Sequence, residues 1–255
     1  MKFFGVATVL LSLASVLCAS SAEARVFDFK DEHWAIYVGG TFGNSNAGDG
    51  AYALSSGNGV SFDKKVQTTS SAEAGLLISL REVNFKFGVD YVMPRELKGI
   101  TGTDASGTKL FSLDSKVAAF VFGGGIELLP FRRPRHRALI GFTYGYAMAS
   151  LTNRYTMTPA GSGALGAGDF SEEATGNGVM LQGYVGWEAN FTDVWTIAIH
   201  AGYRELIIPV FKSTKSTNAI SGNQSEGQDI LNMDGTARSM NLGGGFAGIN
   251  FRFYL

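Results

Sequence analysis

The feature that most limits the fold is a strict alternation of apolar and polar side chains that recurs along the chain. Between residues 195 and 203, for example, Trp195, Ile197 and Ile199 share one phase, whereas His200 lies in the other. Successive side chains of a β-strand point to opposite faces of its sheet, so this period of two predicts strands with one apolar face. The alternating segments lie at residues 34–42, 72–80, 83–93, 113–128, 138–148, 179–189, 195–203 and 247–255. The sequence therefore predicts an all-β protein with eight strands.

The fourth segment, residues 113–128, has two possible apolar faces. One consists of Val117, Ala119 and Val121, and the other of Phe120, Phe122 and Ile126. A β-bulge at the three consecutive glycines, residues 123–125, would switch the phase and accommodate both faces. The alternation alone leaves this choice open.

Composition excludes several classes of protein. Charged residues make up only 17% of the 255 residues, and the net charge is −1, so no basic surface for nucleic acid is expected. Aromatic residues make up 12%, which is too many for a disordered chain.

The first residues have the pattern of a secretory signal peptide. A basic start at Lys2 precedes an apolar run at residues 6–17, and Ala22 and Ala24 provide the small residues of a cleavage site. We therefore predict a signal peptide at residues 1–24 and one exported β-barrel domain at residues 25–255. Cys18 is the single cysteine and falls within the signal, so we expect no disulfide, cysteine metal site or cysteine nucleophile after cleavage.

The connections between the predicted strands alternate between short and long. Short links lie at residues 81–82, 130–135 and 190–193, and long ones at residues 43–70, 94–111, 152–176 and 210–237. An up-and-down meander places all short turns at one end of the sheet and all long links at the other. Long irregular links are unusual in a compact soluble domain but normal at the outward end of a bacterial membrane barrel.

Alternation is compatible with a soluble barrel that has an apolar interior or a membrane barrel that has an apolar exterior. The central positions of the apolar phase contain no charge, as hydrocarbon requires. The nine residues from Trp195 to Tyr203 also suffice to cross a bilayer, which needs about 9–11. Aromatic residues are expected at both membrane interfaces, with Trp34, Trp187 and Trp195 at the short-turn end and Tyr91 and Tyr203 at the other. These patterns favour the membrane barrel.

The last strand ends with Phe251, Phe253 and Leu255 in phase, which resembles the insertion signal of bacterial outer-membrane barrels. Such proteins usually end in Phe or Trp, so Leu255 is a departure. Across residues 34–255 the pattern resembles the small eight-stranded OmpA/OmpX-type, porin-like family. This resemblance implies an antiparallel up-and-down transmembrane β-barrel in the outer membrane, with periplasmic termini. The expected partners are outer-membrane lipids and the barrel-insertion machinery, and the expected state is a monomer.

An eight-stranded barrel is only just wide enough for its own side chains. Charges in the inward phase therefore predict a network of ion pairs across the lumen, with glycines leaving room for long side chains. The predicted members are Glu73, Arg81, Lys86, Asp90, Glu188, His200, Arg204 and Arg252. The alternative is a narrow channel for small solutes or hydrophobic compounds, whose charges select what passes.

Some small outer-membrane barrels are lipid hydrolases that need a nucleophile, a histidine and an orienting acid. His33, His136 and His200 are the three histidines, and none has a serine two residues later in an exposed phase. No cluster of metal ligands is visible either. We therefore predict no catalytic residues, no metal and no cofactor, with lipid hydrolysis as a second alternative to a structural or environment-interacting role.

One run of basic residues lies in the short turn after the fourth strand: Arg132, Arg133, Arg135, His136 and Arg137. It is predicted to be a solvated turn. The alternative is contact with anionic lipid head groups or the cell wall on the periplasmic side.

Overall fold

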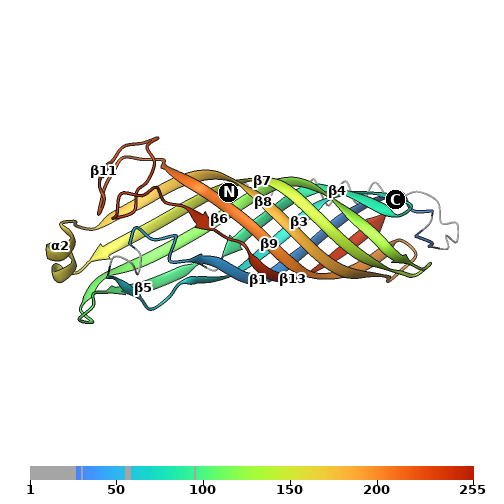
Figure 1. Cartoon of the computed structure of the whole chain (residues 1–255), viewed down its shortest axis with the longest axis horizontal. Helices are drawn as coiled ribbons and strands as arrows, with labels where there is room; N and C mark the ends of the chain where they lie inside the picture. The colour runs from blue at the N-terminus through green and yellow to red at the C-terminus, as the bar shows by residue number, and fades with distance from the viewer. Residues whose placement is uncertain (1–26, 30, 55–58, 95) are drawn as a thin grey trace.

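The computed structural model describes residues 27–29, 31–54, 59–94 and 96–255, and most of them form long antiparallel strands (Figure 1). The predicted signal peptide, including Cys18, lies outside the described residues. Among the described helices, none combines the length and the hydropathy needed to span a membrane.

Eight long strands form the wall of the molecule. They are β1 (Trp34–Gly48), β3 (Val66–Leu80), β4 (Val83–Pro94), β6 (Lys109–Arg132), β7 (His136–Met157), β8 (Phe170–Asn190), β9 (Trp195–Ser213) and β13 (Gly244–Tyr254). Shorter elements lie at one end of the wall: β2 (Ser61–Phe62), β5 (Leu97–Thr103), α2 (Pro159–Leu165), β10 (Thr217–Ala219), β11 (Gly222–Gln224) and β12 (Met240–Asn241).

The sheet closes on itself. Each long strand pairs antiparallel with the next in the order β1, β3, β4, β6, β7, β8, β9 and β13. The ring is completed by pairing of β13 with β1, where Val38 lies opposite Phe251. Closure is required in lipid because an open sheet edge would leave its backbone groups without hydrogen bonds. The predicted eight-stranded up-and-down barrel is confirmed.

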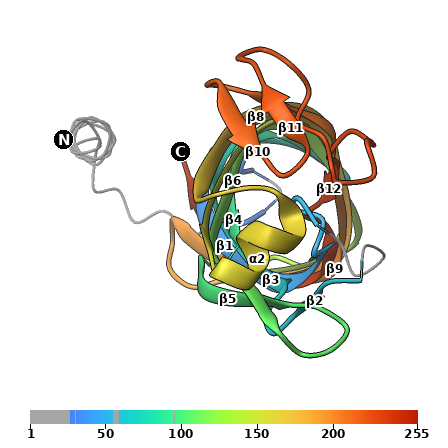
Figure 2. The ribbon, with the colours of Figure 1, turned by 90° about the vertical axis from the view of Figure 1, so that its left-hand side faces the viewer.

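The short turns all lie at one end of the barrel, which also holds the start of β1 and the chain end at Leu255. The other end, the outer end, carries α2 and the short strands, and α2 lies in front of the barrel mouth (Figure 2). The prediction of four long irregular links is wrong in its bounds, because strands fill much of them. β6 and β7 contain 24 and 22 residues, about twice the number that crosses a bilayer.

The ambiguous fourth segment has a single phase from residue 113 to residue 128. Phe120, Phe122 and Ile126 are exposed on the outer wall, whereas Val117 and Val121 are buried inside. Pairing with β4 continues without a shift through the three glycines at 123–125, so the suggested bulge is not there. The register of β6 with β7 instead shifts between Leu128 and Phe131, near the short turn.

The polarity of the wall reverses along its length, as β7 shows. In its first half the outward side chains are apolar, including Phe142 and Met148, whereas the inward side carries Arg137. In its second half the outward side chains are polar, including Thr152, whereas Leu151 is buried inside. The first half suits surrounding hydrocarbon and the second suits surrounding water. The half of the barrel at the short-turn end, called the lower half, therefore spans a membrane. The half at the outer end projects from it.

The projecting half has an apolar core that the sequence did not predict. Side chains from the outer half of the wall pack against residues 51–54. These four residues lie inside the outer end of the barrel and are almost completely buried. The Tyr52 hydroxyl donates to the Lys64 carbonyl at 3.2 Å, and burial together with nearby Asp49 raises the pKa of Tyr52 well above its ordinary value. Residues 230–242 also contribute Ile230, Met240 and Leu242 to this core.

Candidate functional site

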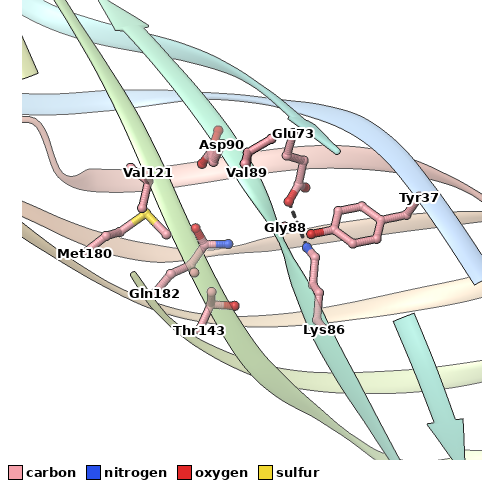
Figure 3. A pocket seen from close by; sticks show the side chains of 11 residues that line it. Tyr37, Glu73, Lys86, Gly88, Val89, Asp90, Val121, Thr143, Met180 and Gln182 are labelled. Atoms are coloured by element: carbon pink, nitrogen blue, oxygen red, sulfur yellow. Dashed lines mark hydrogen bonds and ion pairs between the residues drawn. The ribbon is translucent and has the colours of Figure 1, made fainter. Parts of the chain in front are cut away.

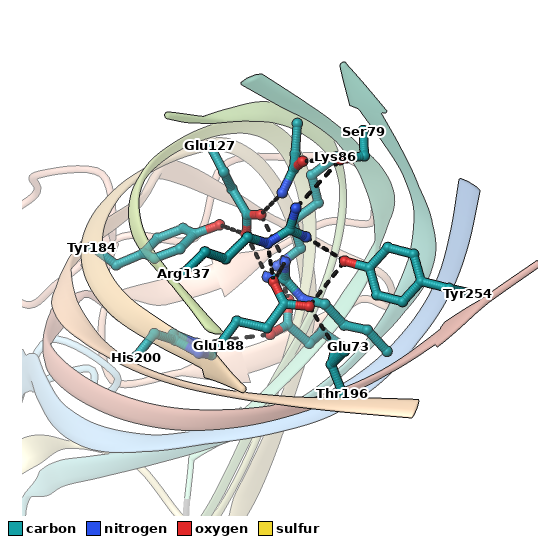
Figure 4. Close-up of polar contacts among 12 residues, drawn as sticks. Glu73, Ser79, Lys86, Glu127, Arg137, Tyr184, Glu188, Thr196, His200 and Tyr254 are labelled. Atoms are coloured by element: carbon teal, nitrogen blue, oxygen red, sulfur yellow. Dashed lines mark hydrogen bonds and ion pairs between the residues drawn. The ribbon is translucent and has the colours of Figure 1, made fainter. Parts of the chain in front are cut away.

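The lumen of the membrane-spanning half is the candidate functional site, because it holds most of the buried charges. At the level nearest the short turns, Arg252 spans two carboxylates, 2.6 Å from Glu127 Oε1 and 2.9 Å from Glu188 Oε2. Arg137 Nε also donates to Glu188 Oε2 at 2.8 Å. All four side chains are at most 1% exposed. This lower network thus joins two carboxylates to two guanidinium groups (Figure 4).

Neutral side chains complete the lower network. Tyr184 and Asn84 donate to the two oxygens of Glu127 at 2.7 and 2.8 Å. Tyr254 and Thr196 donate to Glu188 Oε1 at 2.9 and 2.5 Å. Each carboxylate therefore has several donors, which offsets the cost of removing it from water. Tyr254 also accepts a hydrogen bond from Arg137.

A second network lies toward the middle of the lumen. Lys86 Nζ donates to Glu73 Oε2 at 2.8 Å, and Arg204 Nη1 lies 3.5 Å from Asp90 Oδ2. Glu73 and Asp90 are directly paired positions on β3 and β4. Lys86 Nζ also lies 4.5 Å from the centre of the Tyr37 ring, a cation–π contact. This middle network too contains two carboxylates and two cations.

The middle network surrounds a cavity of only about 20 Å³ (Figure 3). Such a volume holds about one water molecule. Tyr37, Glu73, Lys86, Asp90 and Gln182 line it. Glu73 Oε1 and Asp90 Oδ1 have no hydrogen-bond partner among the described residues, so a single bound water suits this cavity.

Glycines admit large rings to the narrow lumen. A Cβ on Gly88 would lie 2.3 Å from the Tyr37 hydroxyl, and one on Gly141 would lie 2.1 Å from the Tyr184 ring. The sequence-based expectation was that glycines make room for long charged side chains. The structure shows that at these two positions they make room for tyrosines.

Both ends of the lumen are filled. At the short-turn end, Phe27 and Phe29 are buried against Tyr254, and the Arg137 guanidinium lies 4.2 Å from the centre of the Phe29 ring. At the outer end, residues 51–54 close the mouth. There the Ala53 N–H donates to the Tyr155 hydroxyl at 2.8 Å, and Asn153 Nδ2 donates to the Ala51 carbonyl at 2.7 Å.

A buried ion pair joins the outer links to the wall. Arg238 Nη1 lies 2.5 Å from Glu172 Oε2, and both side chains are fully buried. Arg238 also donates to the Leu231 carbonyl at 3.0 Å, and Asn153 donates to Glu172 at 3.4 Å. Arg238 thereby ties residues 230–242 to β8, next to the inserted residues 51–54.

Replacing Arg238 with Met is expected to loosen the outer end without unfolding the membrane-spanning half. Removal of one partner leaves the Glu172 carboxylate buried without its counter-ion, which costs about 3–5 kcal/mol. Hydrogen exchange should accelerate at residues 51–54 and 230–242 but not in the lower halves of β7 and β8. Uniform acceleration throughout the barrel, or none at all, would contradict this separation.

Seven of the eight predicted lumen residues lie in the lumen, in two groups. Glu188 and Arg252 belong to the lower network, whereas Glu73, Lys86, Asp90, His200 and Arg204 lie at the middle level. The prediction that Arg81 lies in the lumen is wrong. Leu80 pairs with Val83, so Arg81 occupies a two-residue turn with φ of 28°, where its side chain is exposed.

Two central members of the lower network were not predicted: Glu127 and Arg137. Arg137 was assigned to the basic turn, but it is buried in the lumen, and this assignment was wrong. Arg137 directly precedes Ala138, the first residue of the apolar phase, and so falls in the opposite, inward phase. That position was the sequence signal that Arg137 lies in the lumen. Glu127 has the same signal once Phe120, Phe122 and Ile126 define the outward phase. The rest of the basic run, including Arg133 and Arg135, is exposed at the short turn.

The predicted interface aromatics lie on the outer wall. Trp34, Trp187 and Trp195 are 40–51% exposed near the short turns. Tyr203 is exposed at the other side of the apolar band and accepts a hydrogen bond from Asn46, and Tyr91 packs against Phe120. Trp187 forms a stack with Phe131 and His136 on the outer wall.

The histidines have no arrangement that resembles a catalytic centre in the described part of the chain. His200 Nε2 lies 3.9 Å from Glu73 Oε1. The His200 ring packs against the rings of Tyr184 and Phe246. His33 Nδ1 lies 3.3 Å from the Ser79 carbonyl. Within the described residues, no three His, Cys, Asp or Glu side chains are grouped so that they could hold a metal ion.

Neither models of protein families nor curated protein sequences match the chain. Solved structures with a similar arrangement include Neisserial surface protein A, at 12% identity and a TM-score of 0.44, covering 87% of this chain and 97% of the other. A major outer membrane protein from Thermus thermophilus gives 12% identity and a TM-score of 0.47 over 86% and 99% of the chains. Ail of Yersinia pestis gives 9% identity and a TM-score of 0.40, covering 87% of this chain and 99% of the other.

The likeness to these proteins concerns the fold alone. The pairing of this chain's own strands establishes the closed barrel, and the apolar band on its outer wall establishes the lipid-facing half. The chain is an eight-stranded antiparallel membrane-spanning β-barrel of the kind found in bacterial outer membranes.

Proposed function

We propose that the protein is a non-conducting, non-enzymatic barrel that anchors a rigid β-structure above the outer membrane. The observation that carries this proposal is a lumen filled along its length. Phe27 and Phe29 close one end, residues 51–54 close the other, and two networks and an apolar core lie between them. A continuous water path would have to displace buried charges from their partners, which is costly.

The charge balance of the lumen also supports a structural role. Each of the two networks pairs two carboxylates with two cations, so neither presents excess charge that would attract a permeating ion. The outer half presents polar side chains to water around an apolar core, as a soluble domain does. We infer that contact with the environment takes place through this projecting half.

Purified barrel inserted into planar lipid bilayers is expected to give no discrete conductance steps. The physical reason is that the cavity within the middle network holds only about one water molecule. A variant lacking residues 27–29 and 51–54 tests the two end closures separately from the networks, which should still block conduction in it. Reproducible single-channel steps from the intact protein would overturn the proposal in favour of a channel.

A further inference from the structure

Two arginines meet at the short-turn end of the barrel, where the turn between β3 and β4 contacts the end of β6. Arg81 lies in that turn, and Arg132 is the last residue of β6. Arg132 Nη1 donates to the Arg81 carbonyl, and the Leu129 N–H donates to the Glu82 carbonyl at 2.9 Å. These two hydrogen bonds hold the turn against β6, so the fold itself sets the positions of both arginines.

A hollow of about 610 Å³ lies between this turn and β6, within the size range of ligand sites. Its lining consists of Arg81, Glu82, Leu129, Pro130 and Arg132. Neither guanidinium group forms an ion pair with a described residue. Glu82 is the single carboxylate of the lining, and Asp28 and Asp31 attract Arg132 only from beyond ion-pair distance. The lining therefore has one more positive charge than it has negative ones.

The hydrogen bonding of Arg132 is incomplete. Its Nε atom is buried and has no hydrogen-bond partner among the described residues. Buried donors in folded proteins are nearly always paired, so an unpaired one points to an acceptor supplied from outside the chain. A phosphate group is a strong acceptor for a guanidinium group, because the hydrogen bonds are charge-assisted and often bidentate.

Arg81 has a backbone conformation that arginine rarely adopts. Its φ is 28°, and in the described part of the chain it is the only non-glycine residue with a positive φ. A two-residue hairpin turn with a positive φ at its first position ordinarily has glycine there. Residues held in such conformations concentrate at binding sites, where the side chain has a role that outweighs the strain. A binding role for the Arg81 side chain explains why arginine occupies this position.

The hollow adjoins the lipid-facing band. Leu80 directly precedes Arg81 and pairs with Val83, which pairs in turn with Leu128. Leu80 and Leu128 are 52% and 45% exposed on the outer wall. A ligand in the hollow therefore has guanidinium groups on one side and apolar side chains on the other. This combination fits the phosphate and the acyl chains of a phospholipid, whereas a cell-wall glycan has no acyl chain to place against the leucines.

We propose that the hollow at Arg81 and Arg132 binds the phosphate group of an anionic phospholipid from the leaflet at the short-turn end. Basic pockets at the ends of membrane-spanning segments bind anionic lipid head groups in this way. Phosphatidylglycerol carries one net negative charge, which balances the excess positive charge of the lining, whereas phosphatidylcholine carries none. Its acyl chains lie along Leu80 and Leu128. The interaction goes beyond the anchoring role proposed above and does not depend on whether the lumen conducts.

The test uses the full barrel in detergent micelles, titrated with phosphatidylglycerol whose acyl chains carry bromine. Bromine quenches tryptophan fluorescence at short range, and Trp34, Trp187 and Trp195 are exposed near the short turns. Each arginine near an anionic group contributes about fivefold in affinity, so saturable quenching is expected at a concentration at least about tenfold lower than with brominated phosphatidylcholine. Equal quenching by the two lipids would refute recognition of the anionic group.

A variant of Arg81 separates binding from folding. Arg81→Asn should weaken the binding of phosphatidylglycerol about fivefold. Its resistance to unfolding by urea should not fall, because asparagine tolerates a positive φ better than arginine does. The matched control is Arg154→Asn, at an exposed position on β7 near the outer end, which should leave lipid binding unchanged. Unchanged binding in Arg81→Asn, or an equal loss in Arg154→Asn, would refute the site.

Two competitors test which molecule the hollow recognises. Glycerophosphoglycerol, the head group without acyl chains, should not displace the brominated lipid at equal concentration, because it makes no contact with the leucines. A soluble cell-wall muropeptide should not displace it either. Displacement by the free head group as effective as that by unlabelled phosphatidylglycerol would identify a site for soluble phosphodiesters. Displacement by the muropeptide would identify a cell-wall site, and either result would overturn the assignment to lipid.

Discussion

Replacement of Arg252 with Met is expected to lower the free energy of unfolding of the barrel by about 3–5 kcal/mol. Arg252 lies between Glu127 and Glu188, and its side chain is 1% exposed. Without it, Glu188 keeps Arg137 as its counter-ion, but Glu127 keeps only its neutral donors, Asn84 and Tyr184. Methionine replaces the volume but none of the hydrogen bonds. The measurement is equilibrium unfolding by urea in lipid vesicles, followed by tryptophan fluorescence.

Two further variants separate charge from packing in this experiment. Lys215→Met removes the exposed ion pair with Glu173, whose side chains are 42% and 47% exposed, and should cost less than about 1 kcal/mol. Glu127→Gln combined with Arg252→Met removes one charge of each sign and should recover a large part of the lost stability. If Arg252→Met costs no more than Lys215→Met, the lower network does not stabilise the barrel.

The second large effect is expected from a lysine placed on different faces of β7. Phe142 is 51% exposed on the outer wall in the middle of the apolar band. Phe142→Lys should therefore cost about 2–4 kcal/mol in a bilayer, because the charge lies in hydrocarbon. Thr152 points outward on the same strand but beyond the band, and Thr152→Lys should change stability by less than about 0.5 kcal/mol.

The neighbouring position tests whether the polarity of the wall reverses. Leu151 is 1% exposed and packs in the apolar core of the projecting half. Leu151→Lys buries an unpaired charge there and should destabilise the outer half by several kcal/mol. The loss in free energy of unfolding, measured in lipid vesicles, should be large for Phe142→Lys and Leu151→Lys and small for Thr152→Lys. Equal costs for Phe142→Lys and Thr152→Lys would show that this face does not contact lipid.

Within the membrane, much of the fold was determined by local sequence alone. The alternation at residues 138–148 and 195–203 identified the strands and their lipid-facing side chains, because in hydrocarbon nearly every outward residue must be apolar. The same rule applied one residue further would have placed Arg137 in the lumen. It was missed because adjacent arginines suggested a turn. Glu127 was missed because the phase of its strand was left open.

Tertiary structure decided which charges pair and what lies above the membrane. The partners of Arg252 come from β6 and β8, and the stagger of strands around a closed barrel brings them together. That stagger is not encoded in any one segment. Beyond Met148 the alternation continues with its polarity reversed, because water replaces lipid outside and an apolar core replaces the polar network inside. Within a single strand, such a reversal looks like the end of a strand, so the projecting half emerged only when all the strands were assembled.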